Sequence, residues 1–347
     1  KVSNLVLKQV DQNWKSFFAA IKAWRVNPDR FLGKPSLPGY KDKLTGRNLL
    51  IYDIQALSKP ALRKGIIRPS QLGIDIETKQ SNIRQARIVP KKGYYVIEIV
   101  YEIKPEPNPK LDYSLVAGID TGIDNLVALT SNKRGFIPLV VNGRPLKSMN
   151  QFYNKRKAEL QSQLTGNRKT SHRINRLTTK RNCKIKNYLH KTSRMIIDHL
   201  LDEGIGVLII GRNLNWKQQV NIGRRNNQNF VSIPHATLNQ MLEYKARLVG
   251  IRVIYQEESY TSKTSFLDLE PVCKQASYLG KRIKRGLFKT ADGRLINADV
   301  NGSFNIIRKA IEPINGKSPE EAEKLYEKDE RYANIVCRCE KVSEAEI

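Results

Sequence analysis

The sequence predicts a mixed α/β fold, and three observations support this class. Residues 5–25 have apolar positions at helical spacing. Residues 48–104 hold several short segments rich in β-branched and aromatic residues, some of them alternating with polar ones. From residue 112 onward the predicted order is three strands, a helix, a strand, a helix, a strand and a final helix. The length of 347 residues is typical of roughly two domains.

The first predicted helix, residues 5–25, has a stripe of apolar side chains that we expect to face a core. The stripe consists of Val6, Val10, Trp14, Phe17, Phe18 and Ile21. Proline and glycine then break the pattern in residues 27–47, where Arg30, Lys34 and Lys41 alternate with aromatic residues. Such a mixture suits a nucleic-acid contact, and an ordinary solvated loop is the alternative.

The β-rich segment predicts strands at 49–52, 73–77, 86–89 and 94–103, which would form a small antiparallel barrel or sheet. Three prolines, Pro105, Pro107 and Pro109, follow this segment. Because such a run is stiff, we expect a domain boundary there.

Residues 114–130 predict a β-hairpin whose first strand ends at Asp120 and whose turn contains Gly122. A buried strand rarely carries a charge without a partner, and a divalent metal ion is a common one. The alternative is a turn aspartate that caps its own backbone. A third strand is predicted at 137–141.

A long basic helical stretch covers about residues 146–203, with Gly166 as a candidate break between two helices. Between Lys147 and Arg194 the only acidic residue is Glu159. This bias is too strong for internal salt bridges, so we expect phosphate contact rather than a merely solvated face. The candidate residues here are Lys155, Arg156, Arg173, Arg176, Lys180, Arg181 and Lys184.

The remaining predicted elements are a buried strand at 206–210, a helix at 234–249, a strand at 251–256 and a last helix that carries Asp299 near its start. Gly211 follows the first of these strands, and Lys217 lies just beyond it. Residues 265–297 look irregular and contain a basic cluster of Lys281, Arg282, Lys284 and Arg285. From Gly316 the chain turns acidic.

The net charge of +28 indicates a polyanionic partner, for which nucleic acid is the default. A membrane surface is the weaker alternative, because no apolar run is long enough to span or anchor. Four cysteines form no disulfide framework in a chain of this length, so we expect a reducing, cytoplasmic setting. The chain begins Lys1-Val-Ser without a methionine, and we expect that it starts inside a longer protein.

The order of elements, with acids at strand or helix ends, fits an RNase H-like fold. Its chemistry is phosphodiester hydrolysis by two divalent metal ions roughly 4 Å apart. Magnesium needs oxygen ligands, so several carboxylates must converge. Asp120 and Asp299 are two candidates, but Gly211 stands where a third would be expected, after the 207–210 strand.

Three motifs resemble the RuvC-type nuclease core of TnpB proteins, the transposon-encoded, RNA-guided DNA endonucleases related to type V CRISPR effectors. They are Gly118-Ile-Asp-Thr-Gly, Tyr260-Thr-Ser-Lys and Asn297-Ala-Asp-Val-Asn-Gly-Ser-Phe-Asn-Ile306. The resemblance covers about residues 5–311. It implies a helical recognition segment at 1–47, a wedge β-barrel at 48–108, and a RuvC-like domain at 109–312 with its helical insertion at about 146–203.

Two departures from the family pattern affect the expected site. The family usually has Glu at the position of Gly211, but some members take the acid from the neighbouring strand end, where this chain has Glu257 and Glu258. We favour Glu258, and the alternative is that both are surface or capping acids. The family's zinc ribbon needs two Cys-x-x-Cys pairs, whereas residues 262–296 contain only Cys273, so we expect no zinc there.

The end of the chain, residues 331–347, resembles the start of a [2Fe–2S]-binding segment found near the end of some glycerol-3-phosphate dehydrogenases. A cluster needs four ligands, and only Cys337 and Cys339 are present. We therefore interpret residues 313–347 as an acidic tail of unrelated read-through sequence. The four histidines show no ligand spacing, and we expect them at the surface or on phosphate.

The resemblance implies an RNA-guided DNA endonuclease of a transposable element, associated with the bacterial nucleoid when bound. Asp120, Glu258 and Asp299 would hold two Mg²⁺ ions, and the partners would be a guide RNA and double-stranded target DNA, with a monomer or homodimer as the working unit. The alternative is a nuclease-dead, RNA-guided DNA-binding repressor, which the glycine at 211 motivates. A simple architectural nucleic-acid binder would not account for the aspartate-bearing motifs.

Overall fold

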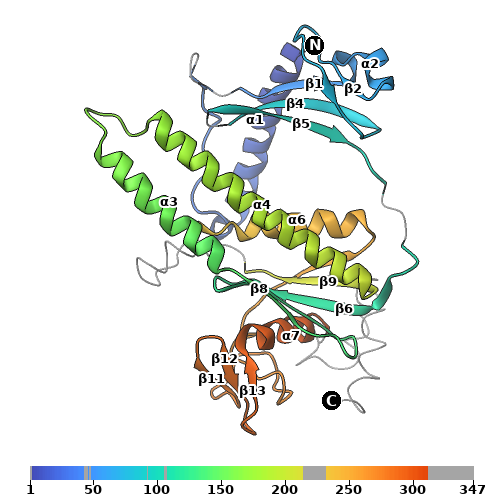
Figure 1. Cartoon of the computed structure of the whole chain (residues 1–347), viewed down its shortest axis with the longest axis vertical. Coiled ribbons are helices and arrows are strands. Elements are labelled where there is room, and N and C mark those ends of the chain that lie inside the picture. Colours follow the sequence, from blue (N-terminus) through green and yellow to red (C-terminus); the bar gives the residue numbers. More distant parts are fainter. Residues whose placement is uncertain are drawn as a thin grey trace. The chain divides into compact units, whose positions relative to one another are not determined.

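The computed structural model describes residues 2–42, 46, 48–91, 93–104, 108–213 and 232–311 (Figure 1). The chain separates into two compact units. One comprises residues 1–104 with 170–176, and the other comprises residues 105–169 with 177–347. Within the described ranges, no helix has both the length and the apolar character that a membrane span needs.

The first unit combines a long helix with two small antiparallel sheets. Its helices are α1 (Val2–Val26), η1 (Pro28–Arg30), η2 (Ile54–Ala56) and α2 (Lys59–Arg63). Its strands are β1 (Leu50–Asp53), β2 (Ile66–Ile67), β3 (Ile76–Glu77), β4 (Ile83–Lys91) and β5 (Tyr94–Tyr101). The strands pair as β1-β4-β5 and β2-β3 around a core that includes Tyr52, Ile67 and Ala86. These pairings do not confirm the expected closed barrel.

Helix α1 forms as predicted, but its apolar stripe does not face a core. No residue of α1 is buried, and Val6, Val10, Trp14 and Phe18 are exposed. The partly buried positions include Phe17 and Ile21 of the predicted stripe. The expectation of a core-facing stripe was therefore wrong for four of its six members. Helical spacing shows that apolar residues share a face, but it does not show that the face is covered.

The second unit is built on a mixed five-stranded sheet. Its strands are β6 (Asp112–Asp120), β7 (Asn125–Ser131), β8 (Leu139–Asn142), β9 (Ile205–Gly211) and β10 (Arg252–Gln256). The order across the sheet is β10-β9-β6-β7-β8. Strands β6, β7 and β8 are antiparallel neighbours, whereas β9 runs parallel to both β6 and β10. The five strands of this sheet and the helices that connect them follow the order that the sequence predicts.

Helices cover both faces of this sheet, as Figure 1 shows. They are α3 (Arg144–Ser162), α4 (His172–Asp202), α6 (His235–Leu248) and α7 (Ala298–Ile311). Leu208 and Ile210 of β9 belong to the larger core with α4 and α6, while Val207 and Ile209 pack with α7. Because side chains alternate along a strand, Gly211 falls on the α7 face.

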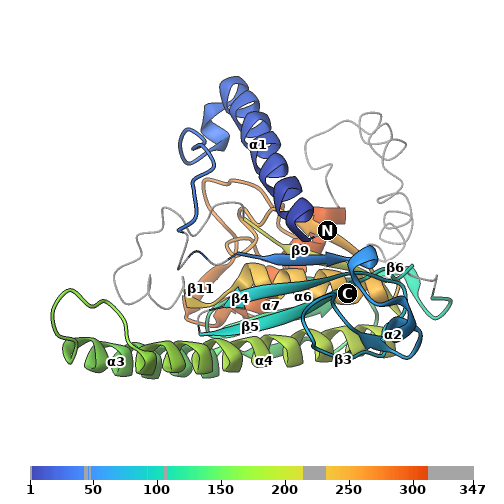
Figure 2. The ribbon, with the colours of Figure 1, turned by 90° about the horizontal axis from the view of Figure 1, so that it is seen from above.

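The basic stretch forms two helices, α3 and α4, which lie side by side (Figures 1 and 2). A hydrogen bond between Tyr153 Oη and Thr178 Oγ1, 3.1 Å long, connects them. Gly166 lies in the connecting loop with a φ of +61°, a value that favours glycine, so the predicted break is confirmed.

The segment expected to be irregular contains a small three-stranded antiparallel sheet. Its strands are β11 (Lys281–Lys284), β12 (Leu287–Lys289) and β13 (Leu295–Asn297). Phe288 of β12 is fully buried and is the largest such side chain among the described residues. The strands have only three or four residues each, which is too short for their alternation to be recognised in sequence.

Candidate active site

Asp120 ends strand β6 and lies against helix α7. Alternation along β6 places Val116, Gly118 and Asp120 on the face that α7 covers. A Cβ added to Gly302 of α7 would lie 2.6 Å from Asp120 Oδ2. The glycine therefore leaves room for the carboxylate beside the helix backbone. Ser303 Oγ donates to Gly118 O at 2.8 Å and fixes the helix against the strand.

Asp299 lies in the first turn of α7. Asn297 caps this helix, because its Oδ1 accepts from the backbone N–H of Asp299 at 2.9 Å and of Val300 at 3.2 Å. The carboxylate of Asp299 accepts from Asn125 Nδ2 at 2.7 Å and from Arg282 Nη2 at 3.1 Å. The start of β7, the basic cluster and α7 thus meet at this acid.

The two glutamates after β10 have different surroundings. Glu257 is exposed and pairs with Lys309 Nζ at 2.6 Å. Glu258 is turned inward, where its Oε2 accepts from Asn213 Nδ2 at 3.2 Å. Its Oε1 is buried and has no hydrogen-bond partner. This oxygen lies 2.2 Å from where a Cβ of Gly211 would be.

The inward-facing carboxylates influence one another electrostatically. Burial raises the pKa of Asp120 to about 7, with the negative charge of Asp299 adding to the effect and Arg282 opposing it. Burial likewise raises the pKa of Glu258 to about 8, with further contributions from Asp120 and Glu257. Asp120 therefore interacts with both other acids. A cluster with this deficit of positive charge favours a bound cation.

The donor set suits a hard divalent cation, because three carboxylates supply only oxygen ligands and one buried oxygen is unpartnered. In the described part of the chain, however, no group of three or more His, Cys, Asp or Glu residues is arranged to hold a metal ion. Asp299 is held by Asn125 and Arg282, and Glu258 is held by Asn213.

A polar cavity of about 480 Å³ adjoins Asp299. Its lining residues are Gly122, Ile123, Asp124, Asn125, Arg144, Arg282, Arg285, Gly286, Asn297 and Asp299. Arg285 forms an ion pair with Asp124, which also accepts from Lys147 Nζ at 2.5 Å. All four members of the predicted basic cluster are exposed, and two of them, Arg282 and Arg285, line this cavity together with Asp299.

The other predicted nucleic-acid residues are spread over both units. Arg30, Lys34 and Lys41 are exposed in the first unit, and Lys217 lies outside the described residues. On α3 and α4 the exposed candidates are Lys155, Arg156, Arg173, Arg176, Lys180 and Lys184.

Arg181 differs from these candidates, because its Nη2 donates to Asn150 Oδ1 at 2.5 Å and to Ser232 O at 3.0 Å. Its guanidinium thus already has partners within the protein. It also lines a cavity of about 320 Å³ between α3 and α4, together with Met149, Phe152, Tyr153, Arg156, Leu177, Lys180 and Lys184.

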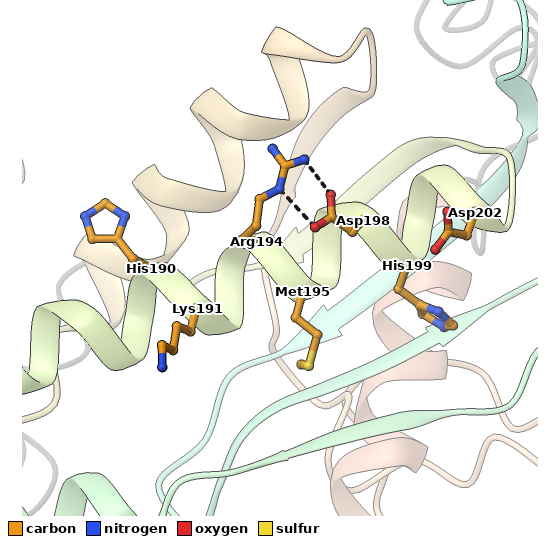
Figure 3. A pocket seen from close by; sticks show the side chains of 7 residues that line it. All are labelled: His190, Lys191, Arg194, Met195, Asp198, His199 and Asp202. Atoms are coloured by element: carbon orange, nitrogen blue, oxygen red, sulfur yellow. Dashed lines mark hydrogen bonds and ion pairs between the residues drawn. The ribbon is translucent and has the colours of Figure 1, made fainter.

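A more open cavity of about 670 Å³ lies along α4. Its lining residues are His190, Lys191, Arg194, Met195, Asp198, His199 and Asp202 (Figure 3). Arg194 and Asp198 pair within the helix at 2.8 Å. No sequence pattern indicates this cavity, and none of the predicted site residues lines it.

Residues that the sequence analysis did not single out shape the site. Asn125, Asn213 and Gly302 contact the three acids, yet a lone asparagine or glycine carries no recognisable chemistry. His235 was expected at the surface, and this was wrong. It is 3% exposed, and its Nε2 lies 2.8 Å from Gly122 O, so it packs under the turn that follows Asp120.

Where the zinc ribbon was expected to be degenerate, a buried carboxylate connects the loops. Glu270 is 1% exposed and accepts from the backbone N–H of Ser265 at 2.7 Å and of Leu279 at 2.8 Å. Cys273 is exposed and free.

Comparison with known proteins places these motifs in a family context. Residues 98–217 match the OrfB_IS605 model, described as a probable transposase, and residues 235–306 match the Cas12f1-like TNB domain. The TnpB-like protein MJ0751 of Methanocaldococcus jannaschii is 26% identical over 70% of this chain and 84% of its own length. This chain is similar in sequence to TnpB-like proteins. The resemblance seen in the sequence is confirmed.

The same relationship extends to larger nucleases. The Cas12f2 endodeoxyribonuclease of a Micrarchaeota archaeon is 26% identical over 63% of this chain, and Cas12f1 of Sulfoacidibacillus thermotolerans is 28% identical over 66%. The match spans only 41% and 53% of those two proteins. A solved Cas12f1–sgRNA–target DNA complex aligns with a TM-score of 0.49 and 18% identity over 65% of this chain and 45% of that one.

Proposed function

We propose that this protein is an RNA-guided DNA endonuclease of a transposable element, with an RNase H-like core that carries Asp120, Glu258 and Asp299 as its active site. The observation that carries the proposal is the place of Glu258. Its buried, unpartnered Oε1 occupies the side-chain space of Gly211, on the sheet face that also carries Asp120. The similarity to proteins named TnpB-like and Cas12f supports the same function.

Asp120, Glu258 and Asp299 would hold Mg²⁺. When bound, the metal activates water and stabilises the leaving oxygen of a phosphodiester. The protein's own residues prepare the site. Asn125 orients Asp299, and Arg282 provides a positive charge beside it that can contact a phosphate oxygen.

Binding of guide RNA and target DNA is assigned to the basic residues. The exposed lysines and arginines of α3 and α4, the 27–47 loop and the 281–285 cluster provide phosphate contacts without sequence preference. Sequence specificity would come from base pairing between guide and target, while the protein reads duplex shape and a short flanking motif.

Cleavage by the purified protein–RNA complex tests this function. Asp120→Ala and Asp299→Ala should each abolish cutting in Mg²⁺ and leave RNA and DNA binding intact. Glu258→Gln should do the same, whereas Glu257→Gln is the matched control, because the neighbouring carboxylate is paired with Lys309 at the surface. Wild-type cutting by either aspartate variant would show that the site is misassigned.

A nuclease-dead, RNA-guided DNA-binding repressor is the second candidate. The glycine at position 211, where the family usually has a glutamate, motivates this candidate. Such a protein would bind its target without cutting it. Robust target cutting that Glu258→Gln abolishes would eliminate this candidate.

A further inference from the structure

The carboxyl ends of β9 and β10 lie next to each other, which brings Glu258 close to Gly211. The two strands pair in parallel, with Gln256 opposite Gly211. Arg212 N donates to Gln256 O at 2.8 Å and extends this pairing by one residue. Glu258 therefore follows its own strand by two residues and reaches back over the end of the neighbouring strand.

A side chain at position 211 and the carboxylate of Glu258 compete for the same space. A Cβ at Gly211 would lie 2.2 Å from Glu258 Oε1 and 2.9 Å from its Cδ. It would also lie 2.6 Å from Ile306 Cδ1 of α7. The φ angle of Gly211 is not in the left-handed region, so space, rather than backbone conformation, accounts for the glycine.

Asn213 holds Glu258 at two points. Its Oδ1 accepts from the backbone N–H of Glu258 at 3.1 Å, and its Nδ2 donates to Oε2 at 3.2 Å. One side chain thus fixes both the backbone and the carboxylate. The other carboxylate oxygen remains buried and unpartnered, directed at the space above Gly211.

We infer that Gly211 and Asn213 form a seat for the Glu258 carboxylate, in which Asn213 is a positioning residue and Gly211 supplies the space. The inference rests on the proposed nuclease function. It has one specific consequence: a glutamate moved to position 211 should replace Glu258, because its side chain would start where the Glu258 carboxylate now lies.

The first experiment measures how Asn213→Ala changes the response to Mg²⁺. Loss of a partner that orients a metal ligand typically weakens metal affinity or activity 10–100-fold. We expect the Mg²⁺ concentration for half-maximal cleavage to rise by about that factor, with target binding unchanged. The metal-induced rise in melting temperature of the protein alone should shrink in parallel.

Asn132→Ala is the matched control for this experiment. Asn132 directly follows β7, where it accepts from Val116 N at 2.8 Å and donates to Ser114 O at 3.1 Å, away from the three acids. It should lower stability without altering the Mg²⁺ response. If Asn213→Ala and Asn132→Ala show the same unaltered response, Asn213 has only a structural role and the inference is overturned.

The second experiment transplants the acid. Glu258→Ala should abolish cutting and the Mg²⁺-induced rise in melting temperature. Combining it with Gly211→Glu should restore both, with cleavage within about tenfold of the wild type, whereas Gly211→Glu alone should lower the melting temperature because two carboxylates then share one space.

The outcomes separate the inference from the function on which it rests. If Asp120→Ala still cuts at the wild-type rate, the proposed nuclease site itself fails. If Asp120→Ala and Glu258→Ala are inactive, but a folded Gly211→Glu/Glu258→Ala double variant regains neither activity nor the metal response, the seat is refuted and the nuclease remains. Should the double variant not fold, the Asn213→Ala comparison still decides.

Discussion

Removing the charge of Glu258 should stabilise the metal-free protein at alkaline pH, even though it inactivates the proposed nuclease. Burial and the nearby Asp120 raise the pKa of Glu258 from 4.5 to about 8. A folded-state pKa above the unfolded value means that the native state binds the proton more tightly. The stability that this proton contributes is fully present below about pH 4.5 and is lost as the pH rises through about 8.

The size of the expected stabilisation follows from the pKa shift of Glu258. One pKa unit corresponds to about 1.4 kcal/mol, so a rise from 4.5 to about 8 corresponds to about 5 kcal/mol. Part of it arises from Asp120, whose own protonation relieves the repulsion, so we expect about 3–5 kcal/mol. Glu258→Gln should therefore match the wild type in free energy of unfolding near pH 5 and exceed it by about that amount at pH 9.

The assay is denaturant unfolding in EDTA, followed by circular dichroism between pH 5 and pH 9. Glu257→Gln is the control, because the pKa of Glu257 is shifted in the opposite direction to that of Glu258. Although burial opposes the effect, hydrogen bonds from Lys309 and Ser259 lower the pKa of Glu257, so its loss should not stabilise at any pH. Parallel pH profiles for wild type and Glu258→Gln would refute the reasoning.

Two further predictions concern the zinc-ribbon region and the basic helices. Glu270→Ala should destabilise the second unit by about 2–4 kcal/mol, because the buried N–H of Ser265 and the partly buried N–H of Leu279 lose their charged acceptor. Thermal unfolding and hydrogen exchange of those amides check this, and unchanged protection would contradict it. Replacing both Lys180 and Lys184 with glutamine should weaken RNA binding and reduce its salt dependence by about two phosphate contacts. Lys309→Gln, which removes a lysine already paired with Glu257, should leave the salt slope unchanged.

The sequence predicted the elements of the second unit well, because buried strands such as β9 and long helices such as α4 have strong hydrophobic patterns. It predicted β11–β13 poorly, since strands of three or four residues show too few alternations. The prediction that the apolar face of α1 packs against a core was also wrong, because helical spacing shows which residues share a face but not what covers that face. Among the candidate acids, the choice between Glu257 and Glu258 stays a prediction, although only Glu258 is turned toward Gly211.

The positions of the site residues follow from strand alternation together with the glycines of the sheet and helix. Because successive residues of a strand face opposite sides of the sheet, residues 116, 118 and 120 of β6 and residues 207, 209 and 211 of β9 all face α7. Apolar side chains at the first positions of each series pack against the helix, whereas Asp120 lies beside Gly302 and Gly211 lies beside Ile306. There, Gly302 leaves room for Asp120 and Gly211 leaves room for Glu258. An acid can therefore reach this place from β9 or from the end of β10, provided that the other position has no side chain. A glycine at 211 is thus compatible with an intact three-carboxylate site, and by itself it is not a sign of lost activity.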